Sequence, residues 1–236
     1  MKVIDIETWD RKTPYQNFVR YTDPIFSLSS RLDVTDLYNF VKKEGHSFFT
    51  DFLFLVATCL NRVEDFRLRI NEEGQVVLFD HIHPNYIVMQ ENGVIATCRS
   101  RFTEDYKTFY AQAREDTERT AKGVAQEKFN RTNENDVFYI SCLPWLDFVS
   151  VTNPYHFDDV PASTIPRLAW GKYVEENGRK RLTFDIAVHH ALLDGKAVCD
   201  GFSLMSAALS RCEEFFASPT ATLDKMCEEL RIKSHL

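Results

Sequence analysis

Two adjacent histidines, His189 and His190, end an apolar segment of the sequence, and an Asp-Gly pair follows at residues 194 and 195 in DIAVHHALLDG (185–195). A strand that only fills a core has no need of imidazoles, whereas a neutral imidazole is well suited to take a proton near neutral pH. The Asp-Gly pair supplies a turn and the start of a helix. A carboxylate there is also suited to a bidentate pair with an arginine, which would fix the loop. The stretch therefore predicts general-base chemistry.

Alternation along this predicted strand separates the two imidazoles. His190 continues the apolar row, and we expect its ring to stay uncharged there because burial disfavours the charged form. His189 falls on the opposite face, so the two rings cannot bind one metal ion together. A hydrogen-bonded core histidine remains an alternative reading of the spacing alone. The apolar row consists of Leu182, Phe184, Ile186 and Val188.

The composition of the 236-residue chain argues against several classes of function. A net charge of −7 disfavours binding to nucleic acid or to an anionic membrane. No apolar run reaches spanning length and the first residues lack the apolar middle of a signal peptide, so we expect a cytoplasmic protein.

The six cysteines show no CxxC spacing and are expected to be reduced packing residues. Neither GxGxxG nor GxxxxGK[ST] occurs, which disfavours the usual phosphate-binding loops.

The hydrophobic periodicity predicts a mixture of strands and helices. Strands are expected over 26–35, 95–102 and 137–145, and hairpins over 66–80 and 165–190, the second turning at 176–178. Helices are expected over 35–43, 47–66, 104–122 and 195–217. We therefore predict an α/β fold, a two-layer α+β sandwich in which helices pack on a large mixed sheet. One domain is expected over 1–218, followed by a tail over 219–236 in which a short helix is possible.

The His-His-x-x-x-Asp-Gly pattern resembles the signature of the CoA-dependent acyltransferase superfamily. That group includes chloramphenicol acetyltransferase, dihydrolipoyl acyltransferase catalytic domains and peptide-synthetase condensation domains. Further segments make the chain similar to the chloramphenicol acetyltransferase family in particular, from about residue 4 to residue 215. They are ETWDRKTPYQNF (7–18), FSLSSRLDVT (26–35), FRLRI (66–70), ISCLPWLDF (140–148) and GKY (171–173).

The resemblance implies an acetyl-CoA-dependent O-acetyltransferase that acts on a hydroxyl of chloramphenicol or a similar small molecule. It implies His190 as the general base, Ser141 as the donor to the oxyanion, and a structural salt bridge between Arg11 and Asp194. No acyl-enzyme and no metal are implied. Trp145 and Tyr173 fall where the family contacts CoA, and the acceptor-binding positions are Phe18, Thr22, Pro24, Phe26 and Ile95.

Because the family is trimeric, the resemblance also implies a homotrimer with active sites between subunits. In that arrangement the histidine of one subunit faces the acceptor pocket of the next. The chain departs from the family at Ala169, where a threonine that helps to hold a water is usual, and at Lys196, where an apolar aromatic residue is frequent. Different residues also stand at several acceptor positions. A same-fold acyltransferase with another hydroxyl acceptor therefore remains an alternative.

Two other functions are weighed against the leading one. A catalytically inactive relative that serves as a binding module is disfavoured. The residues that the resemblance assigns to catalysis are all intact, namely His190, Ser141, Asp194 and Arg11. A dihydrolipoyl acyltransferase core is disfavoured as well, because no lipoyl or subunit-binding domain precedes the catalytic region. The pair His81 and His83 in DHIHPNY (80–86) has the spacing of some metal sites, but the absence of a nearby cysteine and the presence of Pro84 favour a solvated loop.

Overall fold

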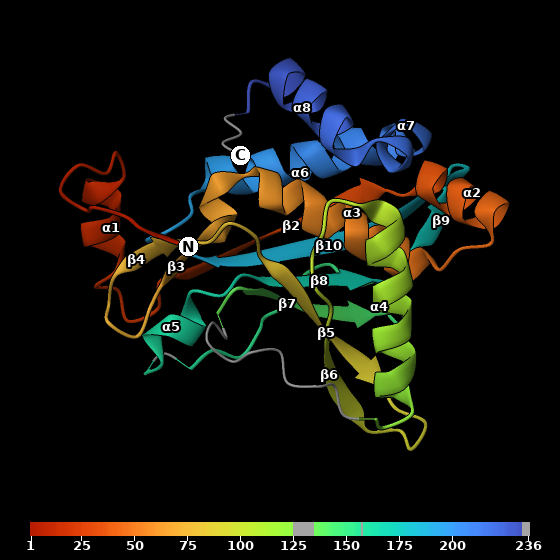
Figure 1. Ribbon diagram of the computed structural model, residues 1–236, viewed down its shortest axis with the longest axis horizontal. Coiled ribbons are helices and arrows are strands. Elements are labelled where there is room, and N and C mark those ends of the chain that lie inside the picture. The colour runs from red at the N-terminus through yellow and green to blue at the C-terminus, as the bar shows by residue number, and fades with distance from the viewer. Residues whose placement is uncertain (125–134, 157, 233–236) are drawn as a thin grey trace.

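The strands of the chain assemble into a seven-stranded mixed sheet with helices packed against it, as the fold class predicted (Figure 1). The computed structural model describes residues 1–124, 135–156 and 158–232. β5, β7 and β8 run parallel to one another, and the remaining pairs are antiparallel. In order across the sheet the strands are β2 (Ile25–Asp33), β10 (Arg179–His189), β8 (Arg167–Gly171), β7 (Val137–Leu143), β5 (His83–Met89) and β6 (Ile95–Arg99), with β9 (Val174–Glu176) paired to β10.

β10 carries the histidine segment and lies between β2 and β8. It is buried on both faces from Leu182 to His189, so its position in the sheet is strongly constrained. The preceding turn places Asn177 and Gly178 at φ values of 52° and 75°, which suits the Asn-Gly pair of a two-residue hairpin. The single hairpin predicted over 165–190 is divided, because β8 ends at Gly171 and β9 then pairs with the start of β10.

The predicted hairpin over 66–80 forms, but it does not join the large sheet. Its strands β3 (Leu68–Ile70) and β4 (Val76–Leu78) pair with each other, and β1 (Lys2–Val3) adds to the outer side of β4. The result is a separate three-stranded sheet near the N-terminus. Hydrophobic alternation predicts a strand but does not specify its partner, so this separation is decided by tertiary packing.

Two of the long helices, α3 (Phe48–Arg62) and α6 (Gly195–Ser210), contact each other in the helical layer. α3 is buried almost all round, which explains its nearly continuous apolar sequence. It ends four residues earlier than predicted and is followed by a short 3-10 turn, η1 (Glu64–Arg67). The other helices that precede β10 are α1 (Lys12–Phe18), α2 (Thr35–Glu44), α4 (Tyr106–Ala121) and α5 (Val160–Ser163).

The C-terminal part of the chain is helical and packs on this layer. The helix predicted over 195–217 breaks at Arg211 into α6 and α7 (Cys212–Ala217), and the region after it forms α8 (Pro219–Leu230). α8 contacts α3, α6 and α7, and its Leu223 and Met226 are fully buried. In the described part of the chain, no helix is both long and apolar enough to cross a membrane.

The cysteines are all free thiols, and most of them fill the core as predicted. Cys59, Cys98, Cys212 and Cys227 are buried, and Cys142 is partly buried. The prediction of a packing role is wrong for Cys199, which lies on the exposed side of α6.

Candidate active site

His190 lies in the turn immediately after β10, against two aromatic rings of its own chain. The ring of Phe18 stacks on the imidazole with centroids 3.8 Å apart and an interplanar angle of 15°, and the Phe26 ring lies 4.6 Å away. The His190 backbone N–H donates to the carbonyl of Pro24 at 2.8 Å. The prediction that the strand continues through His190 is wrong by one residue, since β10 ends at His189. The imidazole is half-buried and held on one side by Phe18.

The hydrogen bond at Nδ1 determines which nitrogen of His190 is free. Nδ1 lies 3.1 Å from the carbonyl oxygen of Leu193. A carbonyl can only accept a hydrogen bond, so Nδ1 carries the proton of the neutral ring. Nε2 then has the lone pair, which is the arrangement that a general base requires. The neighbouring His189 is different, because burial lowers the pKa of its imidazole to about 4 and it lies in the sheet interior.

Asp194 joins the turn to α6 and to the N-terminal segment. Its Oδ1 accepts the Ala197 N–H at 3.1 Å as the helix N-cap, and its Oδ2 accepts from Nη1 of Arg11 at 2.7 Å. Burial by itself raises the pKa of Asp194, but the Ala197 N–H and the Arg11 guanidinium together outweigh it and hold the pKa below its usual value. The predicted contact between Arg11 and Asp194 is present. It is a single hydrogen bond and not the expected bidentate pair, because the second oxygen caps the helix.

Asp65, in η1, is a second carboxylate beside Arg11 that the sequence analysis missed. Its Oδ2 lies 3.8 Å from Nη1 of Arg11. Burial raises the pKa of Asp65 to about 6; Arg11 opposes that shift and Asp194 adds to it. Asp65 stands in the segment RVEDFRLRI, where nothing in the local pattern distinguishes it from the solvated acid Glu64. Only the folded chain brings it to Arg11, 54 residues away in sequence (65 − 11).

The raised pKa of Asp65 predicts a pH dependence of stability. An unfolded aspartate loses its proton at about pH 4, whereas Asp65 in the fold keeps it to about pH 6. Between these two pH values the folded state binds more protons than the unfolded state. The contribution of Asp65 to the free energy of unfolding therefore falls as pH rises. Asp65→Asn is expected to flatten this decline, as measured by urea denaturation at several pH values from 4 to 7. Equal slopes in the two proteins would contradict the assignment.

Ser141 and the two aromatic residues implied in CoA contact lie together, at the opposite end of the sheet. Ser141 is near the end of β7, Trp145 follows that strand, and Tyr173 follows the neighbouring β8. The Lys172 N–H donates to the Leu146 carbonyl at 2.9 Å, which connects the two segments. Trp145 is 71% exposed and Tyr173 is 37% exposed. The Tyr173 ring packs against Tyr38 and Phe48, whereas Trp145 is open to a ligand or a partner.

Strand register shows that one chain does not bring Ser141 to His190. Ser141 pairs with Ala169, and Ala169 pairs with Asp185 on β10. Ser141 is thus two strands away from β10, and it is level with Asp185, which precedes His189 by four residues along β10 (189 − 185). Strand spacings of about 4.8 Å and rises of about 3.3 Å per residue put about 16 Å between the backbones of Ser141 and His189. We refer to the surroundings of His190 and of Ser141 in one chain as the His190 half-site and the Ser141 half-site.

The acceptor positions are also divided. Phe18, Phe26 and Pro24 gather around His190 of the same chain, whereas the sequence analysis expected the histidine to face the acceptor pocket of a neighbouring subunit. Thr22 is exposed in the loop between α1 and β2. Ile95 is 61% exposed on β6, four strands from β10, which corresponds to about 19 Å across the sheet. Within one chain Ile95 is therefore not part of the His190 half-site.

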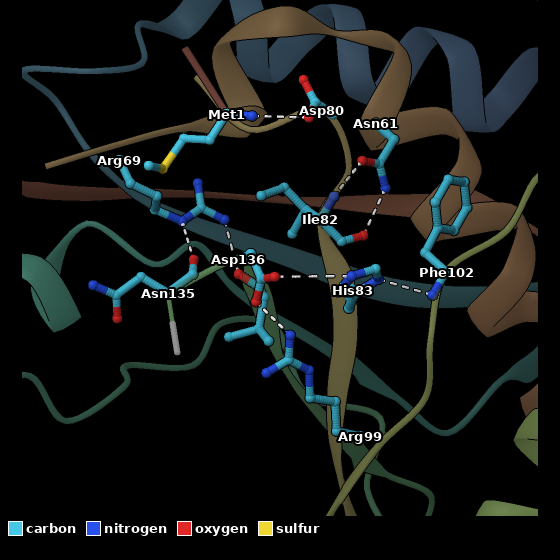
Figure 2. A network of polar contacts seen from close by, with 11 residues as sticks. Met1, Asn61, Arg69, Asp80, Ile82, His83, Arg99, Phe102, Asn135 and Asp136 are labelled. Atoms are coloured by element: carbon cyan, nitrogen blue, oxygen red, sulfur yellow. Dashed lines mark hydrogen bonds and ion pairs between the residues drawn. The ribbon is translucent and has the colours of Figure 1, made fainter. Parts of the chain in front are cut away.

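His83, one member of the predicted His81–His83 pair, belongs to a different polar network, shown in Figure 2. His83 begins β5 and is partly buried, so the expectation of a solvated loop is wrong for this residue. Its Nδ1 accepts the Phe102 N–H at 2.9 Å, its Nε2 lies 3.8 Å from Asp136, and Asp136 also pairs with Arg99. Burial lowers the pKa of His83 to about 4. The described residues include no group of three His, Cys, Asp or Glu side chains that could hold a metal ion.

Comparisons with known proteins agree in naming one family. The family model described as chloramphenicol acetyltransferase matches residues 1–207. The chain is 30% identical over 201 residues to a chloramphenicol acetyltransferase of Campylobacter coli, covering 83% of this chain and 92% of that one. It is 28% identical over 203 residues to one of Clostridium perfringens, with coverages of 83% and 92%.

The solved structures show the same similarity. A chloramphenicol acetyltransferase structure matches with a TM-score of 0.78 at 27% identity, covering 88% of this chain and 99% of that one. A truncated catalytic core of the 2-oxoacid dehydrogenase multienzyme complex from Thermoplasma acidophilum matches with a TM-score of 0.63 at 14% identity, covering 89% and 98%. The second similarity shows a shared fold alone.

Proposed function

Because the chain belongs to the chloramphenicol acetyltransferase family and is an acyltransferase, we propose that it transfers an acetyl group from acetyl-CoA to a hydroxyl of chloramphenicol or a similar small molecule. The observation that carries this proposal is the state of His190. Its Nδ1 is committed to the Leu193 carbonyl, which leaves Nε2 as a base next to the Phe18 and Phe26 rings.

In the proposed reaction His190 and Ser141 act on the two reacting partners. Acetyl-CoA supplies an activated thioester carbonyl. Nε2 of His190 takes the proton of the acceptor hydroxyl while the hydroxyl oxygen bonds to that carbonyl carbon. The Ser141 hydroxyl donates to the carbonyl oxygen, on which negative charge develops. When the carbon–sulfur bond breaks, His190 returns its proton to the departing thiolate. The products are the acetyl ester and CoA, and no acyl-enzyme forms.

The separation of the half-sites supports a homotrimer in which each active site forms between two copies. In a closed ring built by head-to-tail contacts, each interface joins two different surfaces, one from each of the two neighbouring copies. The surface beside Ser141 is apolar and uncovered in one chain: Trp145, Leu146 and Val149 are 71%, 60% and 86% exposed. Such a patch is typical of an interaction or ligand-binding surface. The His190 end of a neighbouring copy would complete the site there.

Arg11, Asp65 and Asp194 have a positioning role in this scheme. Asp194 fixes the first turn of α6, and Arg11 ties that turn to the segment that leads into α1 and Phe18. The His190 turn is therefore restrained from both sides. Holding a general base in one orientation lowers the entropic cost of the reaction.

A second candidate is the same reaction on a different hydroxyl compound. Ala169 lies opposite Ser141 in the strand register and is buried, so no hydroxyl is present at the position where relatives are expected to carry threonine. Lys196 is 70% exposed and pairs with Asp200 at 2.5 Å, where an apolar aromatic residue is frequent. Both differences lie in segments that shape the site, and they favour an acceptor that differs in polarity from chloramphenicol.

A thiol-release assay with acetyl-CoA distinguishes these candidates. Turnover with chloramphenicol, detected as free CoA and as the acetylated product by mass spectrometry, is the expected result. Turnover restricted to another alcohol in a panel of hydroxylated compounds would select the second candidate. Absence of CoA release with every member of the panel would contradict both proposals.

A further inference from the structure

A pocket of about 570 Å³ lies between the C-terminal end of α2, the start of α4 and α7. This volume is in the usual range for small-molecule sites. Its walls are aromatic and include Phe40, Tyr110 and Phe216. α2 and α7 lie at the end of the molecule opposite to α1, which carries the Phe18 that stacks on His190 (Figure 1). The pocket therefore takes no part in the His190 half-site.

Behind this pocket lies a carboxylate that the proposed reaction does not use. Asp51 is fully buried in α3 between apolar neighbours. The Tyr106 hydroxyl donates to its Oδ1 at 2.7 Å, while Oδ2 has no hydrogen-bond partner and lies 3.4 Å from Nδ1 of His46. Burial raises the pKa of Asp51 to about 6, against the opposing effects of Tyr106 and His46. An incompletely paired buried carboxylate behind a pocket is a candidate for a functional group.

Tyr106 and Asp51 together determine the free nitrogen of His46. The Tyr106 hydroxyl uses its proton on Asp51, so its oxygen accepts from Nδ1 of His46 at 3.0 Å. Nδ1 is then the protonated nitrogen, and the nearby Oδ2 of Asp51 favours the same tautomer. Nε2 has no hydrogen-bond partner among the described residues, and His46 lines the pocket. In this tautomer Nε2 is the nitrogen that can accept a hydrogen bond from a ligand.

The charges at the rim of the pocket cancel. Lys43 on α2 pairs with Glu213 on α7 at 2.7 Å. The remaining charged residues of the lining are Glu44 and Lys107, which have opposite signs. The formal charges of these four residues therefore sum to zero. Aromatic walls, an imidazole acceptor and a lining without net charge together suit a flat, uncharged molecule with a hydrogen-bond donor.

We propose that this pocket binds a neutral aromatic compound carrying a hydroxyl group, which donates to Nε2 of His46 while its rings pack against Tyr110, Phe40 and Phe216. The site is separate from the acetyl-transfer site and goes beyond the proposed function.

The probes for this site are 2-naphthol and 2-methoxynaphthalene, which share a ring system but differ in the hydroxyl proton. Binding to the intact protein is measured by ligand fluorescence and by the imidazole NMR signals of His46. The expected result is that 2-naphthol binds about tenfold more tightly than the ether, because only the naphthol pairs with Nε2. Binding of 2-naphthol should shift the His46 signals.

Two variants test the assignment independently of stability. His46→Phe keeps an aromatic ring and removes the acceptor, so the ratio of the two affinities should fall to about one. His190→Ala changes the other aromatic-lined site and should leave the ratio unchanged. The affinities for 2-naphthol and for the ether are compared within each protein. A change in fold stability affects both affinities and leaves their ratio unchanged. Equal affinities in the wild type, a ratio unchanged in His46→Phe, or a ratio lost in His190→Ala would each overturn the proposal.

Discussion

Replacing His190 with alanine is expected to lower kcat/KM for acetyl transfer by about 10²–10⁴-fold, the usual contribution of a positioned general base. The reason is structural: the Leu193 carbonyl holds the proton on Nδ1 and leaves Nε2 to act as the base beside Phe18 and Phe26. Steady-state kinetics with acetyl-CoA and the accepted hydroxyl compound measure the change. Added imidazole should restore part of the activity, because a small base can enter the space left by the ring.

The control for this variant is His81→Ala, which removes the exposed histidine two residues before His83 and should retain wild-type kinetics. Thermal denaturation of both variants shows whether the fold is intact. Loss of activity in His190→Ala with no rescue by imidazole would indicate a packing role for the ring beside Phe18. Retention of most of the activity would contradict the assignment of His190 as base.

Mixing two inactive variants is expected to restore activity if each site draws His190 and Ser141 from different copies. Ser141→Ala alone should reduce kcat by about 10²–10³-fold, as the loss of one oxyanion donor does. In a trimer coexpressed from equal amounts of His190→Ala and Ser141→Ala chains, half of the sites receive an intact His190 and half of those an intact Ser141. About one quarter of all sites are then complete. The expected activity of the purified mixture is therefore about one quarter of wild type.

A matched mixture makes this result specific. Chains with His190→Ala combined with chains that carry both substitutions contain no intact His190, so they should remain inactive under the same coexpression. Size-exclusion chromatography with light scattering checks that both mixtures have the mass of a trimer. A His190→Ala and Ser141→Ala mixture as inactive as its parents would show that the site is not shared between copies, and the homotrimeric scheme would fail.

The elements of this protein could be predicted closely because their signals are local. Alternation of apolar side chains marks β10, and the Asn177–Gly178 pair marks its turn. Asp194 followed by a glycine marks the start of α6, and the side chain caps that helix in the structure. The boundaries were less accurate where a helix changes type or breaks, as it does at Val63 and Arg211. Those breaks depend on what each helix packs against, which a local pattern does not contain.

The candidate site was predictable in part for the same reason. The resemblance predicted a salt bridge between Arg11 and Asp194, and in the structure Nη1 of Arg11 lies 2.7 Å from Oδ2 of Asp194. It gave no indication of Asp65, whose surroundings in the sequence resemble any solvated acidic segment. The Asp51–His46–Tyr106 cluster was equally impossible to predict, because Tyr106 on α4 is distant in sequence from Asp51 on α3 and from His46 in the loop before α3.

The sequence by itself determined the fold class, the family and the identity of the residues proposed for catalysis, since these follow from short-range patterns and from segments in a fixed order. The tertiary structure alone decided how those residues are distributed. Register along β7, β8 and β10 leaves Ser141 and His190 at opposite ends of one sheet. Strand pairing is a contact between distant parts of the chain, and it is set by the burial of whole faces, which no single segment encodes.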